Sequence, residues 1–206
     1  KKPVPIEEPL AQQELARTNL EKLRQTAPQW YPLAAYLSGK GFDLYRNTAL
    51  RYLPTGEAYL EDMLTTLDTA QRFIFLEYFI MAEGEIWDRL SDILCRKSRQ
   101  GVEVKLIFDD FGSMMRMPNE KIDALQDAGV EVRVFNPVHH YVNRLYFNYR
   151  DHRKITCVDG DIAYTGGANI ADEYANLIER FGYWKDCGLR LEGEGAWGLT
   201  REFIHM

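Results

Sequence analysis

One short segment of the chain carries side chains that can act together on a phosphate ester. His152 and Lys154 stand two positions apart at the start of an apolar run, so in a strand both side chains point to the same face of a sheet. A second apolar run ends at Gly166, Gly167 and Asn169. Glycines let a ligand approach the backbone closely, and imidazole, ammonium and carboxamide groups suit a phosphate. The types and spacing of these residues therefore predict a phosphate site.

Positive charge gathers around the same segment. Four basic side chains stand against one acidic side chain, for a local charge of +3: Arg144, Arg150, Arg153 and Lys154 against Asp151. The whole chain of 206 residues has 25 basic and 31 acidic side chains, for a net charge of −6. The local charge predicts an anionic substrate. The acidic balance of the whole chain argues against nucleic acid as a partner.

Strands and helices that alternate along the chain are predicted to hold these residues. Apolar and alternating runs predict strands at 42–46, 49–54, 73–80, 102–109, 130–135, 154–158, 161–166 and 183–193. Amphipathic runs predict helices at 8–25, 55–70, 85–100, 118–129, 169–182 and 197–206. The β-α-β-α-β order predicts parallel strands, and Asp159-Gly160 predicts a hairpin. The expected fold class is α/β, with a central mixed β-sheet flanked by helices on both faces.

The spacing around His152 also resembles a known motif. The pattern HxKxxxxDxxxxxxGGxN is similar to the HKD signature of the phospholipase D superfamily, with matches at His152, Lys154, Asp159, Gly166, Gly167 and Asn169. The flanking segments resemble the amino-terminal catalytic half of bacterial cardiolipin synthases: LEYFI at 76–80, GVEVKLIFDDFGS at 101–113, NYRDHRK at 148–154, GGANIADEY at 166–174 and RFGYWKDCGLRLEG at 180–193.

The resemblance covers roughly residues 42–206. We expect these residues to form a phospholipase D-like catalytic domain with one HKD motif, and residues 1–41 to form a linker and an amphipathic N-terminal segment. Within that segment Trp30, Tyr31 and Tyr36 either pack as a cap on the core or contact a membrane interface. The chain is expected to be a piece of a longer protein, because the family has upstream transmembrane helices and a second HKD half.

The resemblance implies a role in phosphoryl transfer for each motif residue. His152 attacks phosphorus through a ring nitrogen and forms a covalent phosphohistidine. Lys154 and Asn169, together with Gly166 and Gly167, bind the phosphate and neutralise its non-bridging oxygens. Neither a metal nor another cofactor is required by this mechanism.

Two carboxylates complete the predicted site. The nucleophile needs a partner that fixes its tautomer, and Asp186 is the candidate by its position in the family, with Glu173 and Glu179 as rivals. Asp159 belongs to the catalytic motif, but its place in an Asp-Gly pair favours a role in shaping the turn.

The implied reaction joins two phosphatidylglycerols to give cardiolipin and glycerol, on the cytoplasmic face of a bacterial cell membrane. The implied partners are the membrane surface and a second HKD half, either in the same polypeptide or in a homodimer. The alternatives are a phospholipase D, a homodimeric phosphodiesterase or endonuclease of the same superfamily, and a non-catalytic half that serves as a scaffold.

Other residue groups suggest different chemistry. Asp109 and Asp110 follow a predicted strand and favour a Mg²⁺-dependent phosphatase as one alternative. His139 and His140 lack the spacing of a zinc site. The odd count of cysteines and the lack of CxxC spacing argue against a disulfide framework and for a reducing compartment. The three cysteines are expected to be small apolar core residues: Cys95, Cys157 and Cys187.

Overall fold

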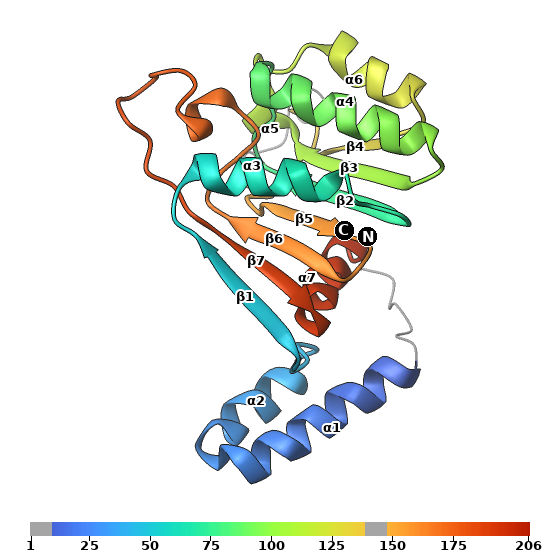
Figure 1. Ribbon diagram of the computed structural model, residues 1–206, viewed down its shortest axis with the longest axis vertical. Coiled ribbons are helices and arrows are strands. Elements are labelled where there is room, and N and C mark those ends of the chain that lie inside the picture. Colours follow the sequence, from blue (N-terminus) through green and yellow to red (C-terminus); the bar gives the residue numbers. More distant parts are fainter. Residues whose placement is uncertain (1–9, 139–147) are drawn as a thin grey trace.

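The computed structural model of the chain describes residues 10–138 and 148–206. Within these residues, seven strands form one mixed sheet in the order β1-β7-β6-β5-β2-β3-β4 (Figure 1). The strands are β1 (Thr48–Leu53), β2 (Phe73–Tyr78), β3 (Glu103–Asp109), β4 (Glu131–Phe135), β5 (Ile155–Val158), β6 (Ile162–Gly166) and β7 (Gly188–Gly193). The pairs β2–β3 and β3–β4 are parallel, and the remaining neighbours are antiparallel.

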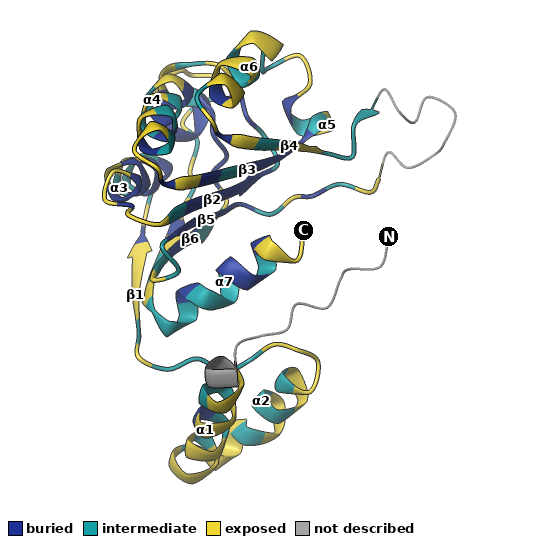
Figure 2. Ribbon diagram, turned by 90° about the vertical axis from the view of Figure 1, so that its right-hand side faces the viewer, coloured by how far each residue is buried: buried dark blue, intermediate teal, exposed yellow. Residues whose placement is uncertain are grey.

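Helices cover both faces of this sheet, as expected for an α/β fold. One face carries α3 (Gly56–Leu67), α4 (Glu85–Arg99) and α6 (Asn119–Asp127), and the other carries α7 (Glu194–Ile204; Figure 2). The larger core lies under α3 and α4, where Tyr59, Leu76 and Trp87 are fully buried. A smaller core packs under α7 around Phe75 and Phe203. The alternation along β2, with Phe75 and Leu76 in different cores, shows how the strand separates the two layers.

The N-terminal helices lie apart from the sheet (Figure 2). They are α1 (Leu10–Thr26), the short 3-10 helix η1 (Pro28–Trp30) and α2 (Tyr31–Ser38). Asn19 on α1 is buried and donates hydrogen bonds to the Leu44 carbonyl (3.0 Å) and the Glu194 carboxylate (3.4 Å). Trp30 and Tyr36 are exposed, so the aromatic stretch is not packed as a cap on the core.

Among the described residues, no helix combines the length and the apolar character that crossing a bilayer requires.

Two predicted elements are wrong. Residues 42–46 form an irregular connection rather than a strand, and β1 begins at Thr48. Residues 169–182 contain only the 3-10 helix η3 (Asp172–Ala175). The reason is that two polar side chains there bind elsewhere: the Asp172 carboxylate accepts the N–H groups of Glu85 and Ile86 at the start of α4, and Asn176 bonds both backbone groups of Trp184.

Cys157 is buried in the smaller core, as expected, and Cys95 is half-buried. The expectation of a core position is wrong for Cys187, which is exposed.

Candidate active site

The predicted site residues other than Asp159 meet at one edge of the sheet. Residues 152–154 precede β5, which is antiparallel to β2, and so they lie beside the carboxyl end of β2. The end of β6 and the start of β7 lie at the same edge, because Gly166 pairs with Gly188. The sheet topology therefore brings His152, Lys154, Gly167, Asn169 and Asp186 to a single edge of the sheet.

His152 presents an exposed imidazole at this edge. Its ring centroid lies 4.8 Å from that of Phe79, the residue that follows β2. Partial burial and the nearby Lys154 charge lower the pKa of His152 below its usual 6.5, although Asp151 and Asp109 oppose the shift. At neutral pH the ring is therefore mainly uncharged, and a nitrogen lone pair is available for attack. No side chain in the described part of the chain hydrogen-bonds to a ring nitrogen of His152.

Lys154 is the buried cation of the site, with 4% of its surface exposed. Its Nζ donates to the His152 carbonyl at 2.6 Å and lies 5.5 Å from the centre of the Phe79 ring. Burial lowers the pKa of Lys154 to about 8, and the carboxylates of Asp151 and Asp186 oppose this shift. Lys154 is therefore still mostly protonated at pH 7, and a bound phosphate stabilises that charge further.

Asn169 is buried and joins two parts of the site. Its Oδ1 accepts the N–H of Ile80 at 2.9 Å, and its Nδ2 donates to the Tyr174 hydroxyl at 2.9 Å. Because the amide nitrogen has two hydrogens, one donor position is left beyond the Tyr174 bond. Asn169 thus fixes the loop after β6 against the end of β2.

The two glycines are required by the neighbouring strand. A Cβ on Gly166 meets the Cys187 carbonyl oxygen at 2.6 Å, and a Cβ on Gly167 meets Asp186 Oδ1 at 2.3 Å. At Gly166 the close atom is backbone, so a larger residue would displace the neighbouring segment; at Gly167 it is a carboxylate oxygen, so a larger residue would displace the Asp186 side chain. The sequence analysis assigns the glycines to the close approach of a ligand. The contacts show instead that residues 186–187, just before β7, approach them closely.

Asp186 lies within the site but does not contact His152 directly. Its Oδ1 accepts the Cys187 N–H at 2.7 Å, and its Oδ2 accepts the Trp184 Nε1–H at 3.3 Å. Its charge raises the pKa of Lys154, as noted above. The rival Glu173 is buried and pairs with Arg116 at 2.6 Å and Arg180 at 2.9 Å. Glu179, the other rival, is exposed.

Asp159 lies at the opposite end of β5 from His152. It has a φ of +55° in the turn between β5 and β6. Its carboxylate accepts three backbone N–H groups, from Gln71, Arg72 and Phe73, at 2.7–2.9 Å. This motif residue is therefore not brought together with the other five, and its contacts are those of a turn-shaping residue.

The positive charge near His152 is largely neutralised, contrary to the expectation from sequence. Arg150 pairs with the buried Asp109 at 3.3 Å. Arg153 projects to the opposite face from Lys154 and pairs with three carboxyl groups: Glu77 (2.7 Å), Asp151 (3.2 Å) and Glu202 (3.5 Å). Arg144 lies outside the described residues. Lys154 is therefore the cation that the described part of this segment offers to a substrate.

Glu77 makes the stability of the domain depend on pH. Its carboxyl is fully buried, and burial together with Asp151 raises its pKa from 4.5 to about 9, despite the opposing charge of Arg153. The folded state therefore holds a proton that the unfolded chain releases above pH 4.5. The free energy of unfolding is expected to fall between pH 5 and 9, by at most about 1.4 kcal/mol per pH unit.

The variant Glu77→Gln tests this dependence, because an amide keeps the shape and loses the titration. Denaturant unfolding at pH 5, 7 and 9 should show a flatter decline for Glu77→Gln than for the unaltered chain. Glu202→Gln is the matched control, since this partly exposed carboxyl pairs with the same arginine. Equal slopes for Glu77→Gln and the unaltered chain would contradict the assignment.

The carboxylates of the phosphatase alternative have structural partners. Asp109 accepts the N–H groups of Phe111 and Asp151 at 2.9 and 3.0 Å, besides its pair with Arg150. Asp110 accepts the Val138 N–H at 2.6 Å. No group of three metal-ligating side chains occurs within residues 10–138 and 148–206. His139 and His140 lie outside the described residues.

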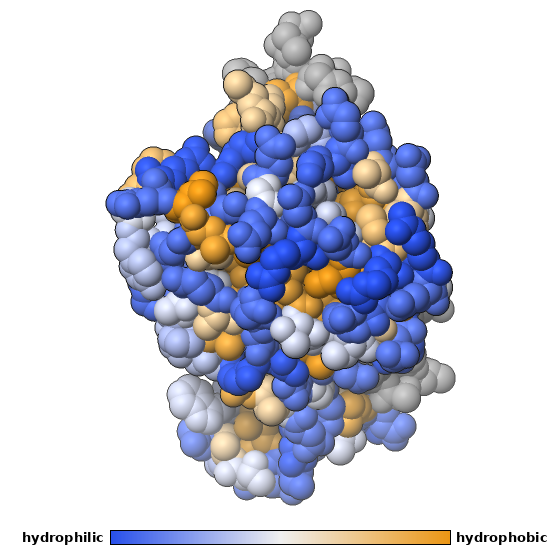
Figure 3. Space-filling view, turned by 45° about the horizontal axis from the view of Figure 1, so that its top comes forward, coloured by the Kyte–Doolittle hydropathy of each residue, from blue (hydrophilic) through white to orange (hydrophobic). Residues whose placement is uncertain are grey.

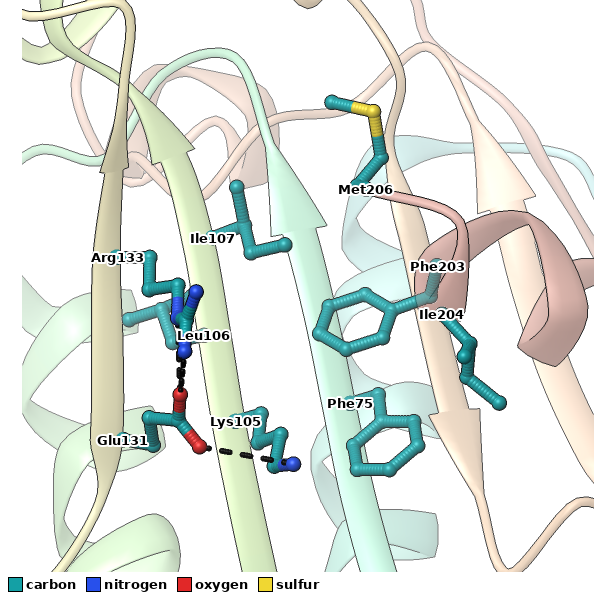
Figure 4. A pocket seen from close by; sticks show the side chains of 9 residues that line it. All are labelled: Phe75, Lys105, Leu106, Ile107, Glu131, Arg133, Phe203, Ile204 and Met206. Carbon is teal, nitrogen blue, oxygen red and sulfur yellow. Dashed lines mark hydrogen bonds and ion pairs between the residues drawn. The ribbon is translucent and has the colours of Figure 1, made fainter. Parts of the chain in front are cut away.

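Two of the hollows on the described surface lie near the carboxyl end of α7. The first borders the site and is lined by Phe135, Tyr149, Arg150, Asp151, His152, Arg153 and Met206. The second lies between β2–β4 and the end of α7, where Glu131 pairs with Lys105 and Arg133 (Figure 4). The second hollow contains none of the motif residues, so we assign the chemistry to the edge that carries His152.

Sequence reasoning missed two residues that organise the site. Phe79 contacts both His152 and Lys154, and Tyr174 holds Asn169. Phe79 lies in LEYFI and Tyr174 lies in GGANIADEY, two segments that resemble the family. Neither side chain is of a type that by itself indicates phosphate chemistry.

A mixed sheet between two helical layers, with an HxK pair at its edge, defines a phospholipase D-like domain. The fold superposes on Nuc from Salmonella typhimurium, a phospholipase D family member, with a TM-score of 0.55 and 16% identity over 77% of this chain and 91% of that one. Residues 63–179 match the family described as cardiolipin synthase, PLD-like domain. The chain belongs to this family.

Two proteins similar in sequence cover most of this chain. An uncharacterized protein of Streptococcus mutans is 44% identical over 91% of this chain and 41% of its own length. A cardiolipin synthase of Oceanobacillus iheyensis is 37% identical over 83% of this chain and 34% of its own length. The chain thus spans about two fifths or less of the length of these two relatives.

Proposed function

We propose that this chain provides one half of the active site of a cardiolipin synthase, with His152 as the nucleophile. The observation that carries the proposal is the pairing of an exposed, mainly uncharged imidazole with the buried ammonium group of Lys154 at one sheet edge. A neutral imidazole is a nucleophile, and an ammonium group in a partly desolvated place stabilises the charge of a phosphodiester under attack. The family assignment and the cardiolipin synthase relatives support the same activity.

The proposed reaction has two balanced steps. A ring nitrogen of His152 attacks the phosphorus of phosphatidylglycerol, the bond from phosphorus to the glycerol headgroup breaks, and glycerol leaves with a proton. A hydroxyl of a second phosphatidylglycerol then attacks the phosphohistidine, loses its proton and forms cardiolipin, which frees His152. Since one phosphodiester replaces another, the exchange requires no external energy source.

The surrounding residues have defined tasks in this scheme. Lys154 and the free amide hydrogen of Asn169 bind the non-bridging oxygens, whereas the Gly167 N–H already donates to the Cys187 carbonyl at 3.2 Å. Asp186, which does not contact His152 in the chain by itself, is assigned the positioning of His152 in the reacting complex, and Asp159 shapes the turn at the far end of β5. The proposed setting is the cytoplasmic face of a bacterial cell membrane, and the proposed partner is a second HKD half, in the same polypeptide or in a homodimer.

Parallel assays with labelled lipid test this function. The chain combined with a second HKD half should convert phosphatidylglycerol to cardiolipin and glycerol, with and without a chelator, and His152→Ala should abolish conversion while the fold is kept. Phosphatidylcholine and plasmid DNA serve as parallel substrates. Release of phosphatidic acid without cardiolipin would identify a phospholipase D instead, and cleavage of DNA alone would identify a nuclease. Loss of activity with the chelator that Mg²⁺ restores would revive the alternative centred on Asp109.

A further inference from the structure

Exposed apolar side chains gather on two loops that flank the candidate site. Further exposed apolar side chains lie on α2, among them Trp30 and Tyr36, and on the paired strands β1 and β7. On the face seen in Figure 3, hydrophobic residues form separate patches among hydrophilic ones. The two loops are 114–116, after the short helix α5 (Asp110–Ser113), and 177–183, after η3. We call their exposed apolar side chains the site rim: Met114, Met115, Leu177, Ile178, Phe181 and Tyr183.

The first loop is fixed directly to the site. The Ser113 hydroxyl accepts the Met81 N–H at 2.9 Å, just beyond the Phe79 ring that contacts His152. Gly112 packs so closely on the Phe79 carbonyl that a Cβ there meets the oxygen at 2.1 Å. Met115 follows this fixed turn with 96% of its surface exposed.

The second loop is fixed to the other side of the site. Tyr174, which holds Asn169, packs on Trp184 with ring centroids 5.1 Å apart. Trp184 packs in turn on Phe181, with centroids 5.9 Å apart. Phe181 and Tyr183 are nevertheless 72% and 66% exposed. Their outer surfaces therefore face water in the isolated chain.

A buried ion-pair cluster joins the two loops. Glu173 Oε1 accepts Arg116 from the first loop at 2.6 Å and Arg180 from the second at 2.9 Å. Glu173 therefore fixes the two loops to a shared base, and each loop carries a guanidinium group beside its exposed apolar side chains. Aromatic and aliphatic side chains mixed with basic ones are typical of segments that enter the boundary between lipid headgroups and acyl chains.

We propose that the site rim is the surface by which this domain enters a phospholipid bilayer. The inference rests on the proposed function, since it takes a phospholipid as the substrate. In a bilayer the phosphodiester lies directly above the acyl chains, so side chains that flank a bound phosphate reach the apolar boundary. The rim flanks the edge that carries His152, whereas the exposed aromatic side chains of α2 lie at the other end of the molecule (Figure 1).

Vesicle binding by the chain itself tests the proposal. Vesicles of mixed phosphatidylglycerol and phosphatidylcholine are sedimented with the chain, with Ile178→Ser/Phe181→Ser and with Trp30→Ser/Tyr36→Ser. All four side chains are exposed, so unfolding midpoints should not change. We expect the rim variant to lose about tenfold or more in the lipid partition coefficient, and the α2 variant to stay within about twofold of the unaltered chain.

The other outcomes overturn the proposal. Loss of binding in the α2 variant alone assigns the membrane contact to α2. Unchanged vesicle binding by the rim variant, together with weaker association with a second HKD half or a second copy, makes the rim a protein interface. His152→Ala separates the two proposals, because it should bind vesicles normally while transfer is lost. Rim-dependent binding without any transfer, even after a second HKD half is added to the unaltered chain, refutes the proposed function and leaves the rim as a membrane surface.

Discussion

A monomeric sample of the 206-residue chain is expected to show no turnover of phosphatidylglycerol. A glycerol alkoxide needs a proton to leave, because its pKa is far above neutrality. His152, once bonded to phosphorus, cannot deliver that proton to the group that leaves on the opposite side. The remaining histidines, His139, His140 and His205, have no lysine two positions later, so residues 1–206 hold one HKD motif.

The missing acid is therefore expected from a second HKD half or from another chain in a symmetric dimer. A sample shown to be monomeric by light scattering is incubated with labelled phosphatidylglycerol, and glycerol release is followed before and after a second HKD half is added. Turnover should begin only after the addition. Steady turnover that rises linearly with monomer concentration and disappears in His152→Ala would show that one histidine suffices.

Asp186→Asn is expected to lower the transfer rate by about a thousandfold or more, if Asp186 holds the His152 ring in the reactive tautomer. The carboxylate lies at the site edge and accepts hydrogen bonds from Cys187 and Trp184, which an asparagine can retain in part. The fold should therefore survive. The measurement is kcat and KM for the chain with a second HKD half, together with an unfolding midpoint.

The division between kcat and KM identifies how Asp186 acts. A positioning role for His152 lowers kcat, whereas a role through the charge of Lys154 raises KM and lowers the pKa of that lysine further. Glu179→Gln is the control, because this carboxylate is exposed. Glu173→Gln should mainly lower stability by weakening the pairs with Arg116 and Arg180. A larger loss of kcat for Glu173→Gln than for Asp186→Asn transfers the positioning role to Glu173.

The alternation of side chains before β5 explains how His152 and Lys154 are fixed in position. Side chains alternate along this segment, so Lys154 faces the site while Arg153 faces α7. There Arg153 is fixed by Glu77 on β2 and Glu202 on α7. One face of the segment thus carries the chemistry, and the other carries ion pairs that fix its position.

Local sequence determined much of this protein, because periodicity and motif spacing are local properties. Strand alternation placed His152 and Lys154 on one face, Asp159-Gly160 predicted the β5–β6 hairpin, and the β-α order predicted a mixed sheet between helices. Only the tertiary structure shows which distant segments come into contact. These contacts turn residues 169–182 into a largely irregular loop, because Asp172 caps α4 and Asn176 binds Trp184. They also fix Arg153 against Glu77, 76 positions away in sequence. Local patterns indicate the face of the sheet on which a side chain lies. The partner that the side chain contacts on that face depends on how distant elements pack, and no local pattern encodes this packing.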